Sequence, residues 1–271
     1  MKSSVLKFTL VAIILFISLN NYAQKFQGKA VYVSKSKMEL GNWGAKLSEA
    51  QKKQIQARLK NRLEKTYVLT FNNTESMFLE EEQIDAISGA TDTWGAYFSR
   101  GDQYKNIQNS KLVQSQEFYG KRFLVKDDLY KIKWELGTET KKIGNYLCYK
   151  AKAFVPKKEL DWYDFSWSDL RNKEKTGMAK EDLVVVEAWY TTQIPVAQGP
   201  GEYWGLPGLI LEVSRGNTTL LCSEIIINPE DKITIEVLSK GKETTKKEYT
   251  ATIQKKMVEM RENRMGRRRS R

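Results

Sequence analysis

Short alternating runs of apolar and polar residues dominate this chain of 271 residues. The first, at 28–34, reads Gly-Lys-Ala-Val-Tyr-Val-Ser, and such alternation is typical of a strand with one buried face. The later runs are rich in β-branched and aromatic residues and end at Gly, Asn or Asp, which favours antiparallel hairpins over β-α-β units. They lie at 67–71, 76–80, 96–98, 104–107, 111–118, 122–125, 131–136, 146–154, 183–190, 209–213, 218–227 and 233–237.

Two segments have a helical period instead. Residues 48–65 begin with Ser48 and Gln51, a capping-box pair, and carry apolar residues every four positions. Because this apolar stripe is narrow and lacks aromatic residues, we expect the helix to pack against the sheet and not to lie on a membrane. A second capping box, Thr245 with Glu248, begins a C-terminal helix. Its inner stripe would consist of Tyr249, Ile253, Met257 and Met260.

These elements predict a mainly β protein of the α+β class. We expect a single curved antiparallel sheet or an open half-barrel, with one helix in the N-terminal half and one at the C-terminus. No repeat, linker or composition break divides residues 24–271, so we expect them to form one domain. The charged segment 157–182, with Trp162, Tyr163 and Trp167, interrupts the strands and is interpreted as a surface insertion.

The first 23 residues have the order of a signal peptide. Lys2 and Lys7 are followed by an apolar run at 8–19, and Ala23 offers a small residue for cleavage. Twelve residues of helix span about 18 Å, less than the roughly 30 Å of a bilayer core. We therefore expect the leader to be removed, the mature chain to be exported to the periplasm or secreted, and no stable transmembrane anchor to remain.

The composition limits the possible chemistry. The chain contains no histidine, which excludes Ser-His-Asp triads, Cys-His dyads, histidine metal centres and histidine pH switches. We expect no cofactor and no metal site. Nucleic acid is not expected as a partner, because export separates the protein from it.

The positive charge is concentrated at the C-terminus. The formal net charge is +12, and residues 255–271 contain eight Lys or Arg against Glu259 and Glu262. We expect this basic tail to be a solvated helix end. The alternative is contact with anionic lipid or with an acidic partner through long-range attraction.

The two cysteines, Cys148 and Cys222, leave two alternatives open. A disulfide between them is possible in an exported protein and would close a loop of about 75 residues. Alternatively, both are small buried strand residues that never meet. Neither cysteine has a sequence environment that marks it as a nucleophile.

The most unusual run is 198–210, Gln-Gly-Pro-Gly-Glu-Tyr-Trp-Gly-Leu-Pro-Gly-Leu-Ile. Pro207 fixes one backbone dihedral, whereas Gly205 and Gly208 permit backbone angles that are closed to other residues. The run predicts a rigid loop that leads into a strand. It differs from a phosphate-binding loop, because no Gly-Lys-Ser/Thr follows and the next element is a strand.

Residues 205–210, Gly-Leu-Pro-Gly-Leu-Ile, are similar to the motif that gives the GLPGLI family of exported Bacteroidota proteins its name. The segments Trp134 to Ala151 and Glu187 to Pro200 resemble the family as well. The resemblance implies an exported protein, often found near outer-membrane transport systems, and it supplies no activity and no catalytic residues. The layout also resembles, in architecture alone, the half-barrels of the LolA group that carry lipoproteins or lipids.

We therefore expect a non-catalytic envelope protein that binds an apolar, lipid-like ligand or docks an envelope protein at the rim of a curved sheet. Alternatively, the aromatic side chains simply fill a large β core. The candidate binding residues are Trp189, Tyr190, Tyr203, Trp204, Gly205, Leu206, Pro207 and Gly208.

Two further functions belong to other classes. A hydrolase with two carboxylates needs no histidine; its candidates would be Glu80 to Glu82, or Asp161, Asp164 and Asp169, although such clusters are usually solvated charge. Copper(I) could be bound by thioethers, but helix packing is the favoured role of the C-terminal methionines. These are Met257, Met260 and Met265.

Overall fold

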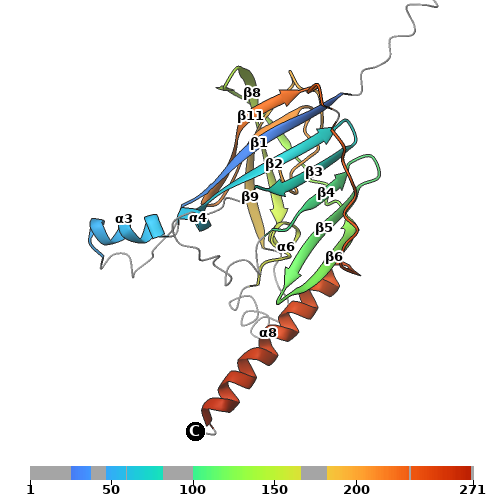
Figure 1. Ribbon diagram of the computed structural model, residues 1–271. Helices are drawn as coiled ribbons and strands as arrows, with labels where there is room; N and C mark the ends of the chain where they lie inside the picture. Colours follow the sequence, from blue (N-terminus) through green and yellow to red (C-terminus); the bar gives the residue numbers. More distant parts are fainter. Residues whose placement is uncertain are drawn as a thin grey trace, which may run out of the picture.

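The computed structural model describes residues 26–37, 47–58, 60–81, 100–165, 182–231 and 233–269. Its strands form a single open sheet of 12 strands (Figure 1), which confirms the mainly β prediction. In their order across the sheet they are β12 (Lys242–Thr244), β6 (Lys121–Asp128), β5 (Lys111–Phe118), β4 (Gln103–Asn106), β3 (Glu75–Glu80), β2 (Glu64–Asn72), β1 (Gln27–Ser36), β11 (Thr218–Ile227), β10 (Leu209–Arg215), β9 (Leu183–Thr191), β8 (Tyr146–Pro156) and β7 (Glu135–Ile143).

Neighbouring strands are antiparallel except at one edge. There β12 pairs in parallel with β6, so the sheet is mixed and not purely antiparallel as predicted. The parallel pairing is possible because the chain crosses from β11 to the far edge of the sheet through residues 228–241 before β12 begins.

The alternation along the strands sorts side chains between two faces. On β1, Ala30 and Tyr32 are fully buried, whereas Lys29 and Lys35 are exposed on the opposite face. We call the face that carries Ala30 and Tyr32 the inner face. A slip of one residue would carry the lysines into the core, so the alternation also fixes the strand register.

The segment 233–240 corrects one predicted strand. Residues 233–237 pair with no strand in the described part of the chain; instead, Ile235 and Leu238 pack against a cluster on β3 to β6 that contains Met77 and Tyr104. These two side chains cover the outer face of the sheet without extending its edge, and Val237 between them stays 52% exposed. The strand predicted at 131–136 begins later, at Glu135, as β7. The strand predicted at 96–98 lies outside the described residues.

The helix predicted at 48–65 is two short helices, α3 (Glu49–Arg58) and α4 (Lys60–Leu63). Ser48 and Gln51 make the reciprocal capping bonds, from Ser48 N to Gln51 Oε1 at 2.9 Å and from Gln51 N to Ser48 Oγ at 3.3 Å. Contrary to our expectation, α3 projects away from the sheet (Figure 1). The ten residues of α3 include only two alanines and one isoleucine as apolar residues, too little apolar surface to hold a helix on a sheet.

The segment predicted as a surface insertion, 157–182, begins inside the body. α6 (Lys157–Leu160) follows β8 directly, and Leu160 and Trp162 are buried. Trp162 contacts the ring of Tyr249 with centroids 5.7 Å apart. Trp162 and Tyr163 therefore serve core packing, and residues 166–181, which include Trp167, lie outside the described part of the chain.

The last helix, α8 (Lys246–Arg269), starts beside β6. Its Tyr249 ring meets the Phe123 ring of β6 at 5.3 Å. None of the helices described here is long and apolar enough to cross a membrane.

The two cysteines lie in different strands, Cys148 in β8 and Cys222 in β11, and both are buried and free. Each thiol donates to a carbonyl of its own strand, that of Tyr146 at 3.7 Å and that of Glu224 at 3.4 Å. Burial raises the pKa of Cys148 to about 11 and that of Cys222 to about 12. This arrangement corresponds to the alternative of two separate strand residues.

We expect both thiols to react with an aromatic disulfide reagent only after unfolding, because the reactive thiolate is scarce at neutral pH and buried. The native protein should release little thiolate anion from the reagent within minutes, and the protein in guanidinium chloride should react at both cysteines. No reaction in denaturant, with a mass lower by two hydrogen atoms, would instead demonstrate a disulfide.

Candidate functional site

The loop between β9 and β10 folds onto the inner face of the sheet and is mostly buried. Within residues 198–210, Gly205 and Pro207 are exposed and Trp204 is half-buried. We call these three residues the loop tip. Residues 198–210 therefore fill the interior of the molecule except at this tip, whereas Thr192, Gln193 and Pro195, earlier in the loop, are also exposed.

Glycine is required where the loop rejoins the sheet. A Cβ atom at Gly208 would lie 2.0 Å from the carbonyl oxygen of Thr191, so no other residue fits there without moving the backbone. Gly205 has a φ of 92°, a region that favours glycine. The amide of Leu209 then donates to the carbonyl of Ile194 at 2.9 Å, which closes the base of the loop.

A buried lysine on β4 donates hydrogen bonds to the backbone of the loop. Gln103 and Lys105 alternate on β4, and both have no exposed surface. The ammonium Nζ of Lys105 donates to the carbonyl oxygens of Gly199 at 2.7 Å and Tyr203 at 3.3 Å. Burying an ammonium group costs free energy unless polar groups surround it. The loop backbone supplies those polar groups, so Lys105 and the loop depend on each other.

Glu202, inside the loop, extends this polar network. One carboxylate oxygen lies 2.6 Å from the guanidinium of Arg100, and the two side chains are only 7% and 10% exposed. The other oxygen accepts a hydrogen bond from Gln103 Nε2 at 3.3 Å, and this amide also donates to Gln114 Oε1 at 3.0 Å. Glu202 is therefore bonded to Gln103 of β4 and to Arg100, which lies shortly before that strand, and both contacts involve its charged carboxylate.

Aromatic rings enclose the guanidinium of Arg100. Its central carbon lies 5.7 Å from the ring centroid of Phe78 and 5.9 Å from that of Tyr163. The Phe78 ring stacks on Tyr67 at 4.8 Å. Such faces stabilise a cation that has lost its water.

Burial dominates the electrostatics of this network. It lowers the pKa of Lys105 to about 7, with the attraction of Glu202 opposing the shift and the charge of Arg100 adding to it. Burial would also lower the pKa of Arg100, but Glu202 and the nearby tyrosines outweigh it, so the pKa is raised. The pKa of Tyr203 is raised by burial. Near neutral pH a small change in pH therefore changes the charge of Lys105, whereas Arg100 stays charged.

Two tryptophans fix the loop tip. The indole N–H of Trp204 donates to the carbonyl of Tyr130 at 3.0 Å, and the indole N–H of Trp134 donates to the carbonyl of Trp204 at 2.8 Å. Both bonds connect the loop to the segment before β7. The tip thus has a fixed conformation although it is exposed.

The predicted binding residues do not lie together at a rim. Tyr203, Leu206 and Gly208 are packed inside the core, and Tyr190 faces the interior beside Tyr149. Of the predicted binding residues, only those of the loop tip lie close to one another and also reach the surface.

Trp189 lies on the outer face, opposite to its neighbour Tyr190. The Nζ atoms of Lys141 and Lys150 lie over its ring, 4.3 Å and 5.7 Å from the ring centroid. Lys141 in turn pairs with Glu212 at 2.6 Å. Lysine side chains therefore cover this ring, and it belongs to a charged surface separate from the loop.

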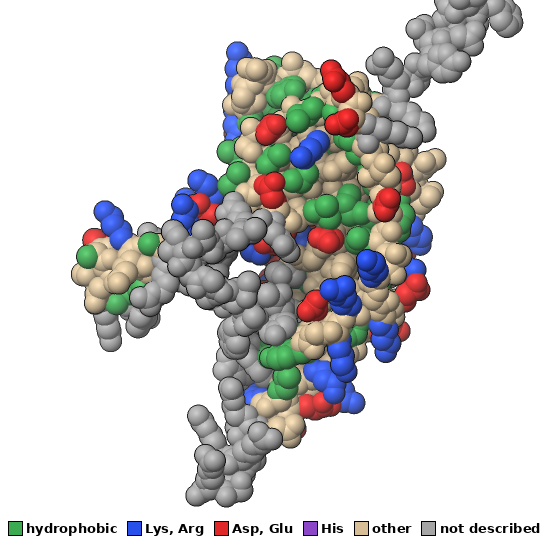
Figure 2. Space-filling model, in the orientation of Figure 1, with side chains coloured by type: hydrophobic (Ala, Val, Ile, Leu, Met, Phe, Trp, Pro, Cys, Tyr) green, Lys and Arg blue, Asp and Glu red, His purple; other side chains and the backbone are tan. Residues whose placement is uncertain are grey.

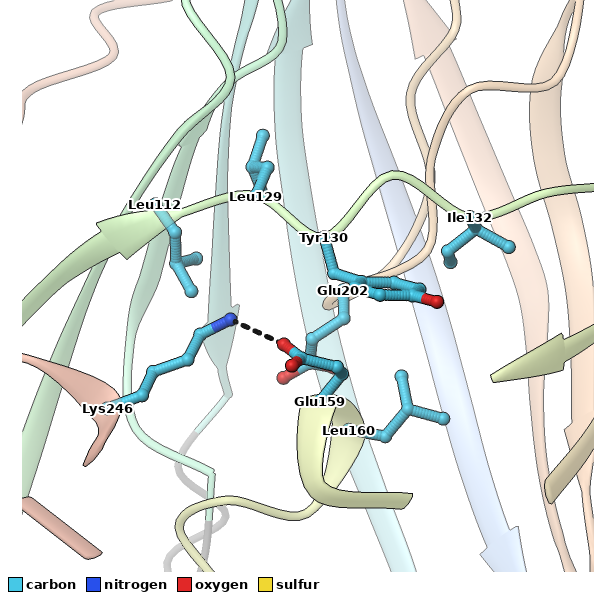
Figure 3. A pocket seen from close by; sticks show the side chains of 8 residues that line it. All are labelled: Leu112, Leu129, Tyr130, Ile132, Glu159, Leu160, Glu202 and Lys246. Carbon is cyan, nitrogen blue, oxygen red and sulfur yellow. Dashed lines mark hydrogen bonds and ion pairs between the residues drawn. The ribbon is translucent and has the colours of Figure 1, made fainter. Parts of the chain in front are cut away.

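A small cavity lies beside Glu202 of the loop (Figure 3). Its volume is about 10 Å³, room for about one water molecule. It brings together two carboxylates, Glu159 and Glu202, but each has a cationic partner, Lys246 at 3.5 Å and Arg100 at 2.6 Å. The cavity is lined by Leu112, Leu129, Tyr130, Ile132, Glu159, Leu160, Glu202 and Lys246.

Two of the carboxylates proposed for a hydrolase, Glu80 and Asp161, each form an ion pair with a cation. Glu80 lies 2.8 Å from Lys65 on the neighbouring strand, and Asp161 lies 2.7 Å from Arg215. Both are therefore engaged with cations. Glu82 and Asp169 lie outside the described residues.

The described residues contain no group of three or more acidic or cysteine side chains that would hold a metal ion. Of the methionines considered for copper, Met257 packs against the cluster around Tyr249, and Met260 is 41% exposed.

Sequence reasoning missed the residues that form the network, namely Arg100, Gln103, Lys105 and Glu202. The alternation on β4 places Gln103 and Lys105 on one face, and this pattern suggests a polar face exposed to water. The only signal was Glu202 itself, a charge inside an otherwise apolar Pro/Gly loop, which indicates a buried partner elsewhere.

We expect the wild-type protein to gain about 2 kcal/mol of unfolding free energy between about pH 7 and 9 relative to Lys105→Met. The pKa of Lys105 is lowered to about 7 in the fold and is normal in the unfolded chain. The unfolded chain therefore binds more protons in this interval, and stability rises with pH. Urea unfolding at both pH values measures the difference. An equal change in both proteins would show that Lys105 does not titrate in this range.

Comparison with known proteins gives a partial family match. A family profile described as "Protein of unknown function (Porph_ging)" matches residues 134–212, which include the loop. A search of curated proteins finds no match.

Two solved structures of PNGF-II resemble the chain. The C2 crystal form has 16% identity and a TM-score of 0.48 over 85% of this chain and 33% of that chain. The P21 form has 15% identity and a TM-score of 0.47 over 84% and 33%. The chain thus spans about a third of the length of these structures.

Proposed function

We propose that this protein is a non-catalytic docking protein of the cell envelope, which binds a partner protein through the loop tip of Trp204, Gly205 and Pro207. One observation carries the proposal: the loop is anchored in the core along most of its length, and an aromatic residue and a proline remain at the surface. Rigid surface groups of this kind bind with a small loss of conformational entropy.

The fixed conformation of the tip supports docking in particular. Trp204 is bonded through its indole N–H and its carbonyl, so its ring is already oriented before a partner arrives. Half-buried tryptophans are frequent anchors of protein interfaces. The flanking Pro207 adds an apolar surface that is stiff at φ.

Carriage of an apolar ligand, the other function expected from the sequence, has less support. The loop itself occupies the inner face of the sheet, and the cavity beside it has a volume of about 10 Å³. A space of this size accepts water and not an acyl chain.

We further propose that the chain is exported and belongs to the GLPGLI family. The leader pattern of residues 1–23 supports export. The family profile match at 134–212 spans the motif at 205–210 and the two flanking segments that resemble the family. The enclosure of the loop by the inner face supports a sheet curved toward a half-barrel.

The test is partner capture followed by a titration. Tagged protein retrieves its partner from a membrane-envelope extract, and the purified partner is then titrated against wild type and Pro207→Glu. Because Pro207 is exposed, the substitution adds a charge to the tip without removing a core contact. We expect about a ten-fold or larger rise in Kd, the cost of one charged group at an apolar contact.

Val237→Glu is the matched control, because Val237 is 52% exposed on the segment that covers the outer face. It should leave the Kd within about two-fold, and thermal unfolding should be similar for both variants. Equal weakening by both substitutions would contradict docking at the tip. A lipid that copurifies at one molecule per chain would favour ligand carriage instead.

A further inference from the structure

α8 begins as part of the protein body. Its Tyr249 and Ile253 are buried, and the hydroxyl of Thr250 donates to the carbonyl of Trp162 at 2.9 Å. The backbone N–H of Lys246 donates to the carboxylate of Asp127 at 2.9 Å. These contacts fix the direction of the helix at its start.

A capping box strengthens this start. The amide of Thr245 donates to Glu248 Oε2 at 3.1 Å, and the amide of Glu248 donates to Thr245 Oγ1 at 3.2 Å. Two amides that the helix leaves without partners are thereby satisfied. The helix is therefore well anchored at its N-terminal end, and its direction beyond the body is set there.

The second half of α8 leaves the body. Met257 is the last residue of the helix that packs against the cluster around Tyr249. Figure 1 shows that the C-terminal end of α8 is separate from the other labelled elements. From Met260 to Asn263 every residue is exposed. The whole helix has 24 residues, a length of about 36 Å at 1.5 Å per residue.

The projecting part carries a large excess of positive charge. Residues 255–271 contain eight Lys or Arg and two Glu, and we call them the basic arm. One of these glutamates, Glu259, pairs with Lys256 at 2.9 Å within the helix. In the described part of the arm, Lys255, Lys256 and Arg261 are exposed on the helix.

One exposed apolar side chain accompanies these cations: Met260 is 41% exposed, whereas Met257 packs against the cluster around Tyr249. A helix end with cations and an exposed apolar side chain suits a membrane interface, where the cations meet headgroups and the apolar side chain enters the headgroup boundary. Nucleic acid would use the cations but not the methionine.

We infer that the basic arm binds the anionic headgroup surface of a lipid bilayer. The attraction is electrostatic, adds up over the cations of the arm and decays within a Debye length of the surface. One exposed methionine is too little apolar surface for insertion, so the contact is reversible and sensitive to salt. This inference does not depend on the loop tip or on its proposed partner.

Cosedimentation with vesicles tests the inference on the full chain. Vesicles of phosphatidylethanolamine and phosphatidylglycerol supply the anionic surface, and phosphatidylcholine vesicles supply the neutral one. We expect partition to the anionic vesicles to be at least about ten-fold stronger, and to be lost at about 0.5 M sodium chloride.

A charge-matched pair of variants locates the contact. In the arm variant, four arginines become glutamine, which keeps good helix propensity. In the control, four exposed lysines of the body become glutamine, so that the net charge changes equally. The arm positions are Arg264, Arg267, Arg268 and Arg269, and the control positions are Lys29, Lys35, Lys121 and Lys131.

We expect the arm variant to lose about ten-fold in partition and the control to lose less than about two-fold. An equal loss of partition in both variants would show that only the net charge of the protein matters, and this would overturn the inference. Absence of binding to the anionic vesicles would also overturn it. So would binding to polyglutamate without binding to vesicles, which would assign the arm to an acidic protein.

Discussion

The contact between Nζ of Lys105 and the carbonyl oxygens of the loop is the constraint on which this structure depends. A lysine without exposed surface is stable only if polar groups replace its water, and here two loop carbonyls do so. The loop in turn can enter the interior only because its backbone oxygens find a donor there. Glu202 and Arg100 add a pair of opposite charges to the same network. The Pro/Gly loop is therefore a structural part of the sheet interior.

This constraint separates the roles of the residues in the loop. Gly208 and Tyr203 belong to the anchored part, one by its close approach to the backbone of Thr191 and the other by its burial. The tip belongs to the surface. Rigidity at the base gives the tip a fixed shape, which lowers the entropy cost of the docking proposed for it. The basic arm is a second surface, positioned by the capping box and the aromatic contacts of α8.

Much of the sheet could be predicted from the sequence, because alternation on strands such as β1 reports burial directly. Residues 233–237 show the limit of this reasoning: an alternating segment can cover a sheet as well as pair with its edge. Trp162 was misread for a related reason, since charge around an aromatic residue suggested a surface. The network around Lys105 was not predictable, because its partners are backbone carbonyls far away in the sequence, and only the fold brings them together.

Native-state hydrogen exchange tests most directly whether the loop is part of the folded core. The amides of Gly205 and Leu209 donate to the carbonyls of Ala197 and Ile194 inside the loop. If the loop is anchored as described, these amides exchange only with global unfolding, at the same free energy as the amides of β1 and β2. Exchange of the loop amides at a free energy lower by about 3 kcal/mol or more, while β1 and β2 remain protected, would show a loop that opens independently and would contradict its role as a core element.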